Sequence, residues 1–111
     1  MTAKNTDHDL QQLAAAAEHF TLVILKWTPD RFMPGSEAIE LQHQQRLASL
    51  RAQRVIAVIA PILSGELGGV LMIRATLEEA AALINEDPCV KAGMQTYELH
   101  PCLGLFEEAP A

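Results

Sequence analysis

The order of apolar and helical segments predicts an α+β fold of the ferredoxin-like kind, with a four-stranded antiparallel sheet and two helices on one face. Three observations predict it. Four short segments rich in β-branched residues alternate with helical patterns in the order strand, helix, strand, strand, helix, strand. A glycine-containing turn joins the middle two strands, as in an antiparallel hairpin. The length of 111 residues suits one domain.

The N-terminal region, residues 1–19, is predicted to be an extension that carries its own helix. Thr6 or Asp7 can cap this helix, and apolar residues follow at helical spacing as far as Glu18. Residues 20–27 then read FTLVILKW, and these β-branched and aromatic residues predict the first strand of the domain.

A second helix is expected after a loop that contains two prolines and a glycine. Ser36 is expected to cap this helix, which should run to about residue 53. Its apolar residues Ile39, Leu47 and Leu50 fall on one face. His43 lies in the middle of that face, so the pattern predicts a histidine directed at the interior.

Turn and capping signals organise the second half of the domain. Residues 55–61 read VIAVIAP and predict the second strand, and residues 70–74 predict the third after a glycine-rich turn. Thr76 and Glu79 form a capping box, which predicts a helix that ends at an Asp-Pro pair. Residues 95–100 alternate as a last strand.

The domain is expected to span residues 20–102, with a short tail over residues 103–111. The net charge of −6 and the scattered basic residues argue against binding to nucleic acid. No apolar run approaches the ~20 residues of a membrane span, and no signal-peptide pattern is visible, so we expect a cytoplasmic protein without a membrane partner. The spacing of Cys89 and Cys102 matches no metal or redox motif, so no metal or cofactor is expected.

Both faces of the predicted sheet are apolar, although two helices can cover only one. Apolar residues alternate on opposite faces: Leu22 and Ile24 against Val23 and Leu25, and Ile56 and Val58 against Ala57 and Ile59. An uncovered apolar face would exceed the few hundred Å² usual for a monomer. We therefore expect a homodimer that pairs its sheet faces. The alternative is that the N-terminal helix folds over the open face.

His43 and Asp87 are the candidate catalytic residues. A buried histidine needs a partner, because an unpaired polar ring costs about 1–3 kcal/mol. A carboxylate that accepts a hydrogen bond from one ring nitrogen fixes the tautomer and leaves the other nitrogen as a general base. Each residue also has a structural interpretation. His43 can bond a backbone carbonyl, and Asp87 can end a helix before proline.

The other candidates favour structural roles. Cys89 is interpreted as a buried spacer rather than a reactive thiol. Tyr97 and His100 lie on the last strand at spacings that do not bring them to one site. Trp27, Phe32 and Met33 are expected to pack in the core of the loop rather than to line a pocket.

Two stretches of the chain are similar to the signatures of YCII-related domains. Residues 43–61 read HQQRLASLRAQRVIAVIAP, which resembles a helix with H-x-x-x-L-x-x-L followed by an apolar strand that ends in proline. Residues 87–93 read DPCVKAG, which resembles the pattern D-P-[aromatic]-V-x-A-G. The glycine-rich turn and the strand after it also fit, so the resemblance covers about residues 20–102.

This resemblance implies a ferredoxin-like domain that pairs through its sheet into a dimeric α+β barrel. It also implies an active site in a cleft, carried over here to His43 and Asp87. Related proteins include a lyase-like enzyme that removes chloride from a hydroxylated aromatic ring, muconolactone isomerases and small monooxygenases.

The chain departs from the family pattern at three positions. Ala60 and Gln53 stand where the family has glycine, and the side chain of Ala60 is expected to narrow a cleft. Cys89 stands where an aromatic residue is common, which is expected to change the wall of a pocket. None of these departures removes His43 or Asp87.

Two functional hypotheses follow. The first is a cofactor-free lyase or isomerase that acts on a small hydroxylated aromatic or lactone-like metabolite, with His43 as general base and Asp87 as the residue that orients it. The alternative is a non-enzymatic dimeric module that binds a small molecule or a partner protein. Replacement of His43 separates them, because the first loses turnover and the second loses only affinity or stability.

Overall fold

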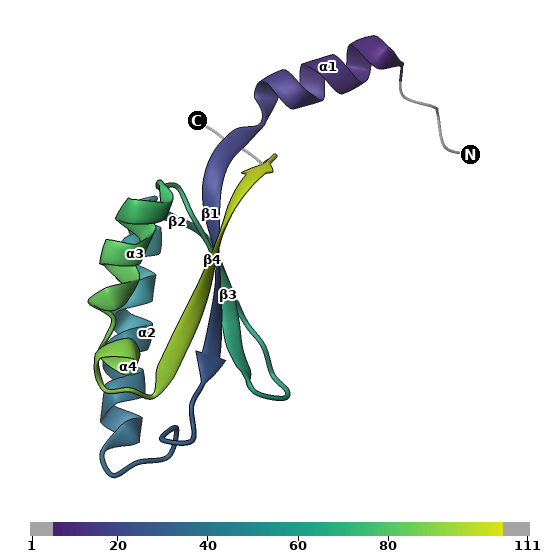
Figure 1. Ribbon diagram of the computed structural model, residues 1–111. Coiled ribbons are helices and arrows are strands. Elements are labelled where there is room, and N and C mark those ends of the chain that lie inside the picture. Colours follow the sequence, from purple (N-terminus) through teal and green to yellow (C-terminus); the bar gives the residue numbers. More distant parts are fainter. Residues whose placement is uncertain (1–5, 106–111) are drawn as a thin grey trace.

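A computed structural model describes residues 6–105, in which one face of a four-stranded antiparallel sheet carries a layer of helices (Figure 1). The strands are β1 (Glu18–Trp27), β2 (Ile56–Pro61), β3 (Leu67–Ile73) and β4 (Gln95–Gly104). The helices are α1 (Asp7–Ala16), α2 (Ser36–Ala52), α3 (Leu77–Asn85) and α4 (Pro88–Lys91). The predicted α+β, ferredoxin-like order is confirmed, with α4 as an addition. Residues 1–5 and 106–111, which include most of the predicted tail, lie outside the described residues.

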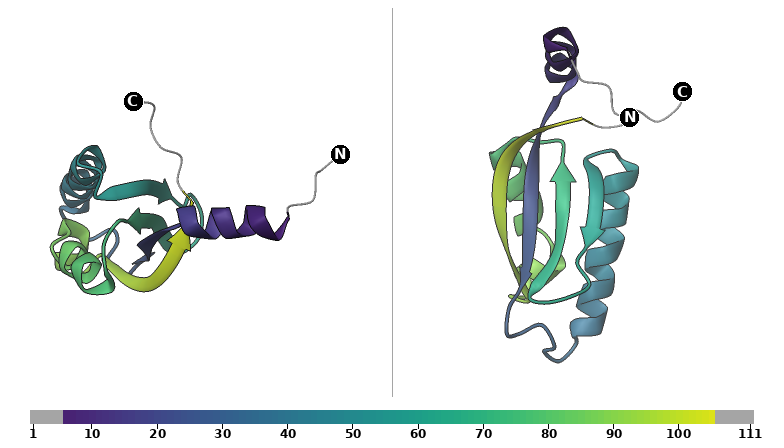
Figure 2. Two further views of the ribbon diagram at one scale, coloured as in Figure 1. Left: turned by 90° about the horizontal axis from the view of Figure 1, so that it is seen from above. Right: turned by 90° about the vertical axis from the view of Figure 1, so that its right-hand side faces the viewer.

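The sheet has the order β2-β3-β1-β4, so β3 lies between two strands that run in the same direction. β4 pairs with β1 along its whole length, from Glu18 opposite Gly104 to Trp27 opposite Gln95. β3 pairs with β1 only from Thr21 onward. The far end of β1 and β4 is therefore a two-stranded ribbon that extends beyond the other strands (Figure 2).

The core lies between the sheet and the helices α2 and α3. Its buried residues are Val23, Leu25, Leu47, Ile56, Leu71, Ile73, Ala80 and Ile84. Burial of each large aliphatic side chain contributes about 1.5–3 kcal/mol. This cluster fixes α2 against the sheet and so determines where His43 lies.

A β-bulge in β2 overturns one expected alternation. Ile56 and Val58 were expected on the same face, but the pairing with β3 shifts between them. Ile56 lies opposite Ile73 in the core and is 1% exposed, whereas Val58 lies opposite Met72 and is 37% exposed. Because the bulge adds one residue to β2, each later side chain of this strand points to the face opposite to the one expected. Ile59 therefore packs against the core.

The helix caps agree with the sequence in two of three cases. Thr6 caps α1 through a box with Asp9, and Thr76 caps α3 through the predicted box with Glu79. Ser36 does not cap α2, because it is already the first helical residue. The cap position belongs to Gly35, whose φ of 83° is the left-handed conformation that glycine adopts without strain.

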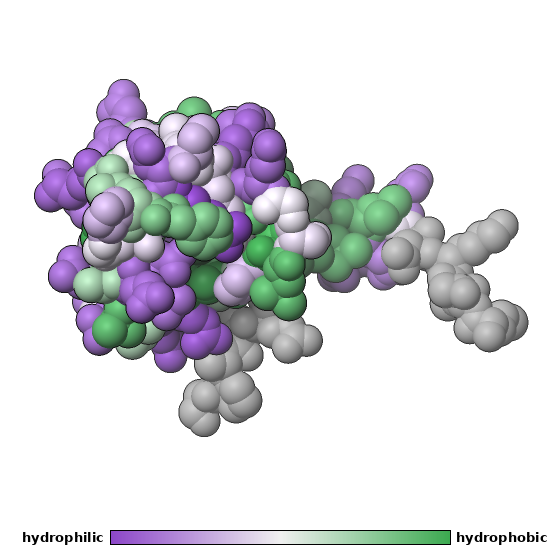
Figure 3. Space-filling model, turned by 90° about the horizontal axis from the view of Figure 1, so that it is seen from below, coloured by the Kyte–Doolittle hydropathy of each residue, from purple (hydrophilic) through white to green (hydrophobic). Residues whose placement is uncertain are grey.

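The second face of the sheet is not covered by α1. α1 points away from the domain and buries none of its residues (Figures 1 and 2). Leu10 and Leu13 are 53% and 44% exposed, and the view from below shows apolar residues of this helix between polar ones (Figure 3). Among the described residues, no helix has both the length and the apolar character needed to cross a membrane.

This open face is apolar on its central strands and polar at one edge. Leu22 lies opposite Met72, and Ile24 lies opposite Val70, all of them half-buried. At the β4 edge the face is polar: Lys26, Glu98 and His100 form linked ion pairs there. No element of the described chain covers the apolar part of this face. The homodimer remains a prediction, and this apolar part is the surface through which we expect it to form.

We expect Ile24→Glu to convert a dimer into a monomer, because a carboxylate between two apolar sheets loses its hydration without gaining a partner. Analytical ultracentrifugation measures the change. Leu41→Glu is the matched control, since Leu41 lies on α2 and is 54% exposed. A wild-type chain that sediments as a monomer at high concentration would contradict the predicted interface.

Candidate functional site

α2 directs His43 into the interior of the domain. Among the residues of this helix only His43 and Leu47 are buried, one turn apart on the face that packs against the sheet. Leu47 belongs to the aliphatic core, whereas His43 is 8% exposed at its edge. A ring in this position retains little contact with water and depends on protein partners for its polar atoms.

Asp87 is held by the short helix α4. It occupies the N-cap position, with Pro88 at the first turn, and its Oδ2 accepts hydrogen bonds from the backbone N–H groups of Cys89 (2.9 Å) and Val90 (3.4 Å). Asp87 is 1% exposed. The sequence analysis placed Asp87 at the end of a helix and did not predict α4. An Asp-Pro pair can also begin a helix, with Asp as the N-cap and Pro as the first helical residue.

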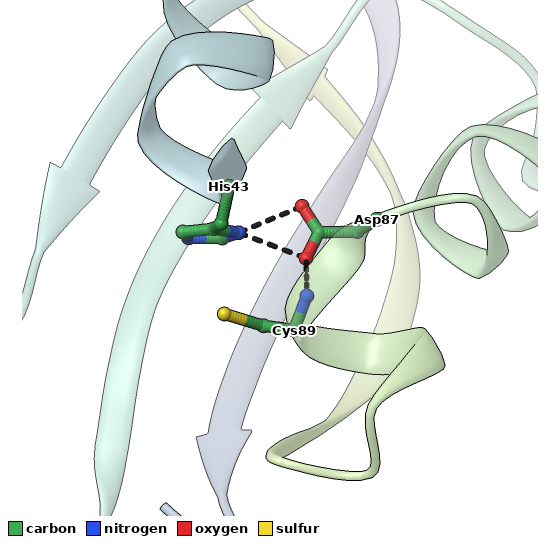
Figure 4. Close-up of side chains that lie close together, drawn as sticks. All are labelled: His43, Asp87 and Cys89. Atoms are coloured by element: carbon green, nitrogen blue, oxygen red, sulfur yellow. Dashed lines mark hydrogen bonds and ion pairs between the residues drawn. The ribbon is translucent and has the colours of Figure 1, made fainter. Parts of the chain in front are cut away.

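The structure brings His43 and Asp87 together, 44 residues apart in the chain. The Nδ1 of His43 lies 2.7 Å from Oδ1 and 2.9 Å from Oδ2 of Asp87 (Figure 4). A carboxylate only accepts hydrogen bonds, so Nδ1 is the donor. In the neutral ring, Nε2 then carries a lone pair on the opposite edge. The partner of His43 is thus a side chain, whereas the structural interpretation assigned it a backbone carbonyl.

A cleft of about 340 Å³ lies on the other side of His43. Its walls come from α2, the hairpin of β2 and β3, and the start of β4. Most of the surface is apolar, with Leu25, Leu47, Ile59 and Leu71 among its residues. His43 lines this cleft, whereas Asp87 is buried behind it, so the imidazole separates the carboxylate from the cleft.

The expectations for the cleft wall have different outcomes. Ala60, which stands where YCII-related domains have glycine, lines the cleft. Trp27 also lines it, although core packing was the favoured interpretation, and Phe32 is 80% exposed. Cys89 does not line the cleft, so its expected effect on the pocket wall is not found.

Cys89 is a buried thiol rather than a nucleophile. Its side chain is fully enclosed, and burial raises its pKa to about 12, with further contributions from the negative charges of Asp87 and Glu40. The thiol therefore remains protonated at neutral pH. This agrees with the interpretation of Cys89 as a spacer.

His43, Asp87 and Cys89 together offer three metal-ligand atoms within 4.8 Å of one another, which the sequence spacing did not predict. A metal would have to displace the proton that Nδ1 donates to the carboxylate and the proton of the thiol.

The remaining candidates do not join the site. The hydroxyl of Tyr97 donates to Oδ1 of Asn85 at 2.6 Å, whereas His100 lies on the opposite face beside Glu98. Sequence reasoning missed two cleft residues, Arg31 and Gln95. The alternation of the last strand predicts that the side chain of Gln95 points towards the helices, so this residue could have been found from the sequence. Nothing in the sequence of the loop distinguishes Arg31.

No protein-family model matches the chain, and no curated protein sequence matches it. Among solved structures, the fold resembles 5-chloro-2-hydroxyhydroquinone dehydrochlorinase (TftG) from Burkholderia phenoliruptrix, in complex with 2,5-dihydroxybenzoquinone. The two share 18% sequence identity with a TM-score of 0.48, over 81% of this chain and 95% of that chain. At this distance the likeness says nothing about individual residues of the cleft.

Asp87→Ala removes both a helix cap and the partner of a buried histidine. We expect a loss of roughly 2–4 kcal/mol in the free energy of unfolding, measured by urea titration. Thr76→Ala removes only a cap, on α3, and should cost about 1 kcal/mol. Equal losses in the two variants would show that the contact with His43 contributes nothing to stability.

The two cysteines should differ in reactivity at mildly alkaline pH. Cys102 is half-buried in the single chain, whereas the pKa of Cys89 is raised to about 12, so the thiolate of Cys89 is a very small fraction at mildly alkaline pH. Mass spectrometry after iodoacetamide treatment should find one label in the folded chain, on Cys102, and two labels in urea. Labelling of Cys89 in the folded chain at the rate of Cys102 would contradict its enclosure.

Proposed function

We propose that this chain is a cofactor-free enzyme of the lyase or isomerase type that acts on a small hydroxylated aromatic or lactone-like metabolite. His43 is the general base, and Asp87 orients it. One observation carries the proposal: both carboxylate oxygens of Asp87 lie within 2.9 Å of Nδ1, while the same imidazole lines an apolar cleft. A base that is oriented from behind and faces a cleft is the arrangement that proton transfer requires.

The chemistry follows from the two edges of the imidazole. Nε2 takes a proton from a substrate hydroxyl or from an acidic carbon, and the resulting imidazolium donates both of its N–H groups. The carboxylate of Asp87 stabilises that cation, since it already accepts from Nδ1. The electron pair released in the substrate then expels a leaving group as an anion, or the proton returns to a different carbon. Neither outcome needs an external oxidant or reductant.

The sequence supports the same assignment from an independent direction. The two stretches that resemble YCII-related domains contain the helix of His43 and the turn of Asp87, and these two segments meet at the contact between His43 and Asp87. We extend the proposal to membership of that family and to a homodimer formed through the open face. The two unpaired cysteines suit a reducing, cytoplasmic location.

The alternative is a dimeric module that binds a small molecule without changing it. The largely apolar cleft favours this alternative as much as it favours an enzyme, because both need to hold a ligand. Only turnover distinguishes them.

We expect His43→Gln to lower turnover by roughly 100-fold or more while the fold and assembly persist, because glutamine fills the space but cannot act as a base. A panel of hydroxylated aromatics, including chlorinated ones, and lactones can be followed by ultraviolet absorbance. His100→Gln is the matched control, since His100 lies on the other face of the sheet with its side chain 51% exposed. A His43→Gln variant with full activity on a confirmed substrate would refute this role for the histidine.

A further inference from the structure

Gln95 lines the cleft and has a buried acceptor without a hydrogen-bond partner among the described residues. This residue is 3% exposed, yet its Oε1 is buried without a hydrogen-bond partner among residues 6–105. An unpartnered buried acceptor costs about 1–3 kcal/mol, so a fold retains one where something else supplies a donor. Because Gln95 lines the same cleft as His43, that donor can come from a bound molecule.

The position of Gln95 depends on the absence of a side chain at Gly68. A Cβ at Gly68 would lie 2.7 Å from Nε2 of Gln95 and 3.4 Å from the ring of Trp27. Gly68 therefore leaves room for the amide and the indole at this end of the cleft. Both groups belong to the cleft wall, so the hairpin is shaped around them.

Arg31 places a positive charge at the same cleft. Its guanidinium carbon lies 4.3 Å from the centre of the Trp27 ring and 4.9 Å from that of Phe32. In the part of the chain that the structure describes, Arg31 forms no ion pair, and its Nε is buried without a partner. Guanidinium groups only donate hydrogen bonds, in a planar fork that matches a carboxylate.

Glu40 adds the opposite charge on another wall. It lies on α2 one turn before His43 and lines the cleft, but it is not paired with Arg31. A ligand anion is repelled by Glu40 and attracted by Arg31, so these two residues fix which way a charged ligand lies.

We propose that the cleft takes a single-ring substrate that carries a carboxylate as well as a hydroxyl. Arg31 binds the carboxylate, and Oε1 of Gln95 accepts a hydrogen bond from a hydroxyl. The ring lies against the apolar wall, within reach of His43. This assignment of Arg31 and Gln95 as specificity-determining residues rests on the proposed function for the chemistry at His43, but binding tests it separately.

The test uses three probes: para-hydroxybenzoate, para-hydroxybenzamide, which lacks the charge, and benzoate, which lacks the hydroxyl. Trp27 is the single tryptophan, so its indole N–H gives one NMR signal that reports on this cleft. We expect para-hydroxybenzoate to shift that signal with an affinity about 10-fold or more above that of either other probe.

Three variants locate the two contacts. Arg31→Gln should remove the preference for para-hydroxybenzoate over para-hydroxybenzamide, and Arg31→Lys should retain part of it. Gln95→Leu should remove the preference over benzoate. Glu40→Gln, the control at the same cleft, should leave para-hydroxybenzoate binding unchanged or tighter. Equal affinity for the acid and the amide in the wild type, no shift with any probe at millimolar concentration, or an equal loss of both probes in Arg31→Gln would overturn the proposal.

Binding to the His43→Gln variant separates the two claims. Unchanged affinity for para-hydroxybenzoate in that variant, together with absence of turnover by the wild type, would refute the enzyme and leave the carboxylate site standing. Turnover of uncharged ring substrates with no preference for their acids would refute the carboxylate site and leave the enzyme standing.

Discussion

The arrangement of this domain depends on the buried carboxylate of Asp87. A carboxylate with 1% exposure is stable only if protein groups replace its hydration. Two backbone N–H groups of α4 and the imidazole of His43 do so, and the three contacts join α4 to α2 at one point. A single side chain therefore begins a helix, ties two helices together and selects which edge of the imidazole faces the cleft.

The sequence predicted the order of the elements because each carries a local signal. The capping box at Thr76 and the apolar face of α2 are examples, and the second of these also pointed to His43. The bulge in β2 was not predictable, because it is a product of pairing with β3. α4 has only four residues, which is too short for a helical repeat of apolar residues to be visible in the sequence. The inward facing of Gln95 follows from the alternation of the last strand, but its unpartnered acceptor depends on the distant residues that form the cleft.

The two faces of the sheet differ in what contacts them. The covered face holds the core and the cleft, whereas the open face presents Leu22, Ile24, Val70 and Met72. Apolar area on the open face is removed from water only by another molecule. The proposed chemistry and the predicted sheet-to-sheet pairing therefore use residues on opposite sides of the strands.

The ribbon formed by β1 and β4 has a consequence for local stability. Near Glu18 and Gly104 the two strands pair only with each other, whereas from Thr21 onward β3 supports β1 from its other side. A two-stranded ribbon is marginally stable in water, and a third strand makes it persistent. We therefore expect the pairing of β1 with β4 to be less stable at the α1 end than where β3 also pairs with β1. β1 therefore combines a segment that two neighbouring strands support, from Thr21 onward, with a less stable segment near Glu18 that only β4 supports.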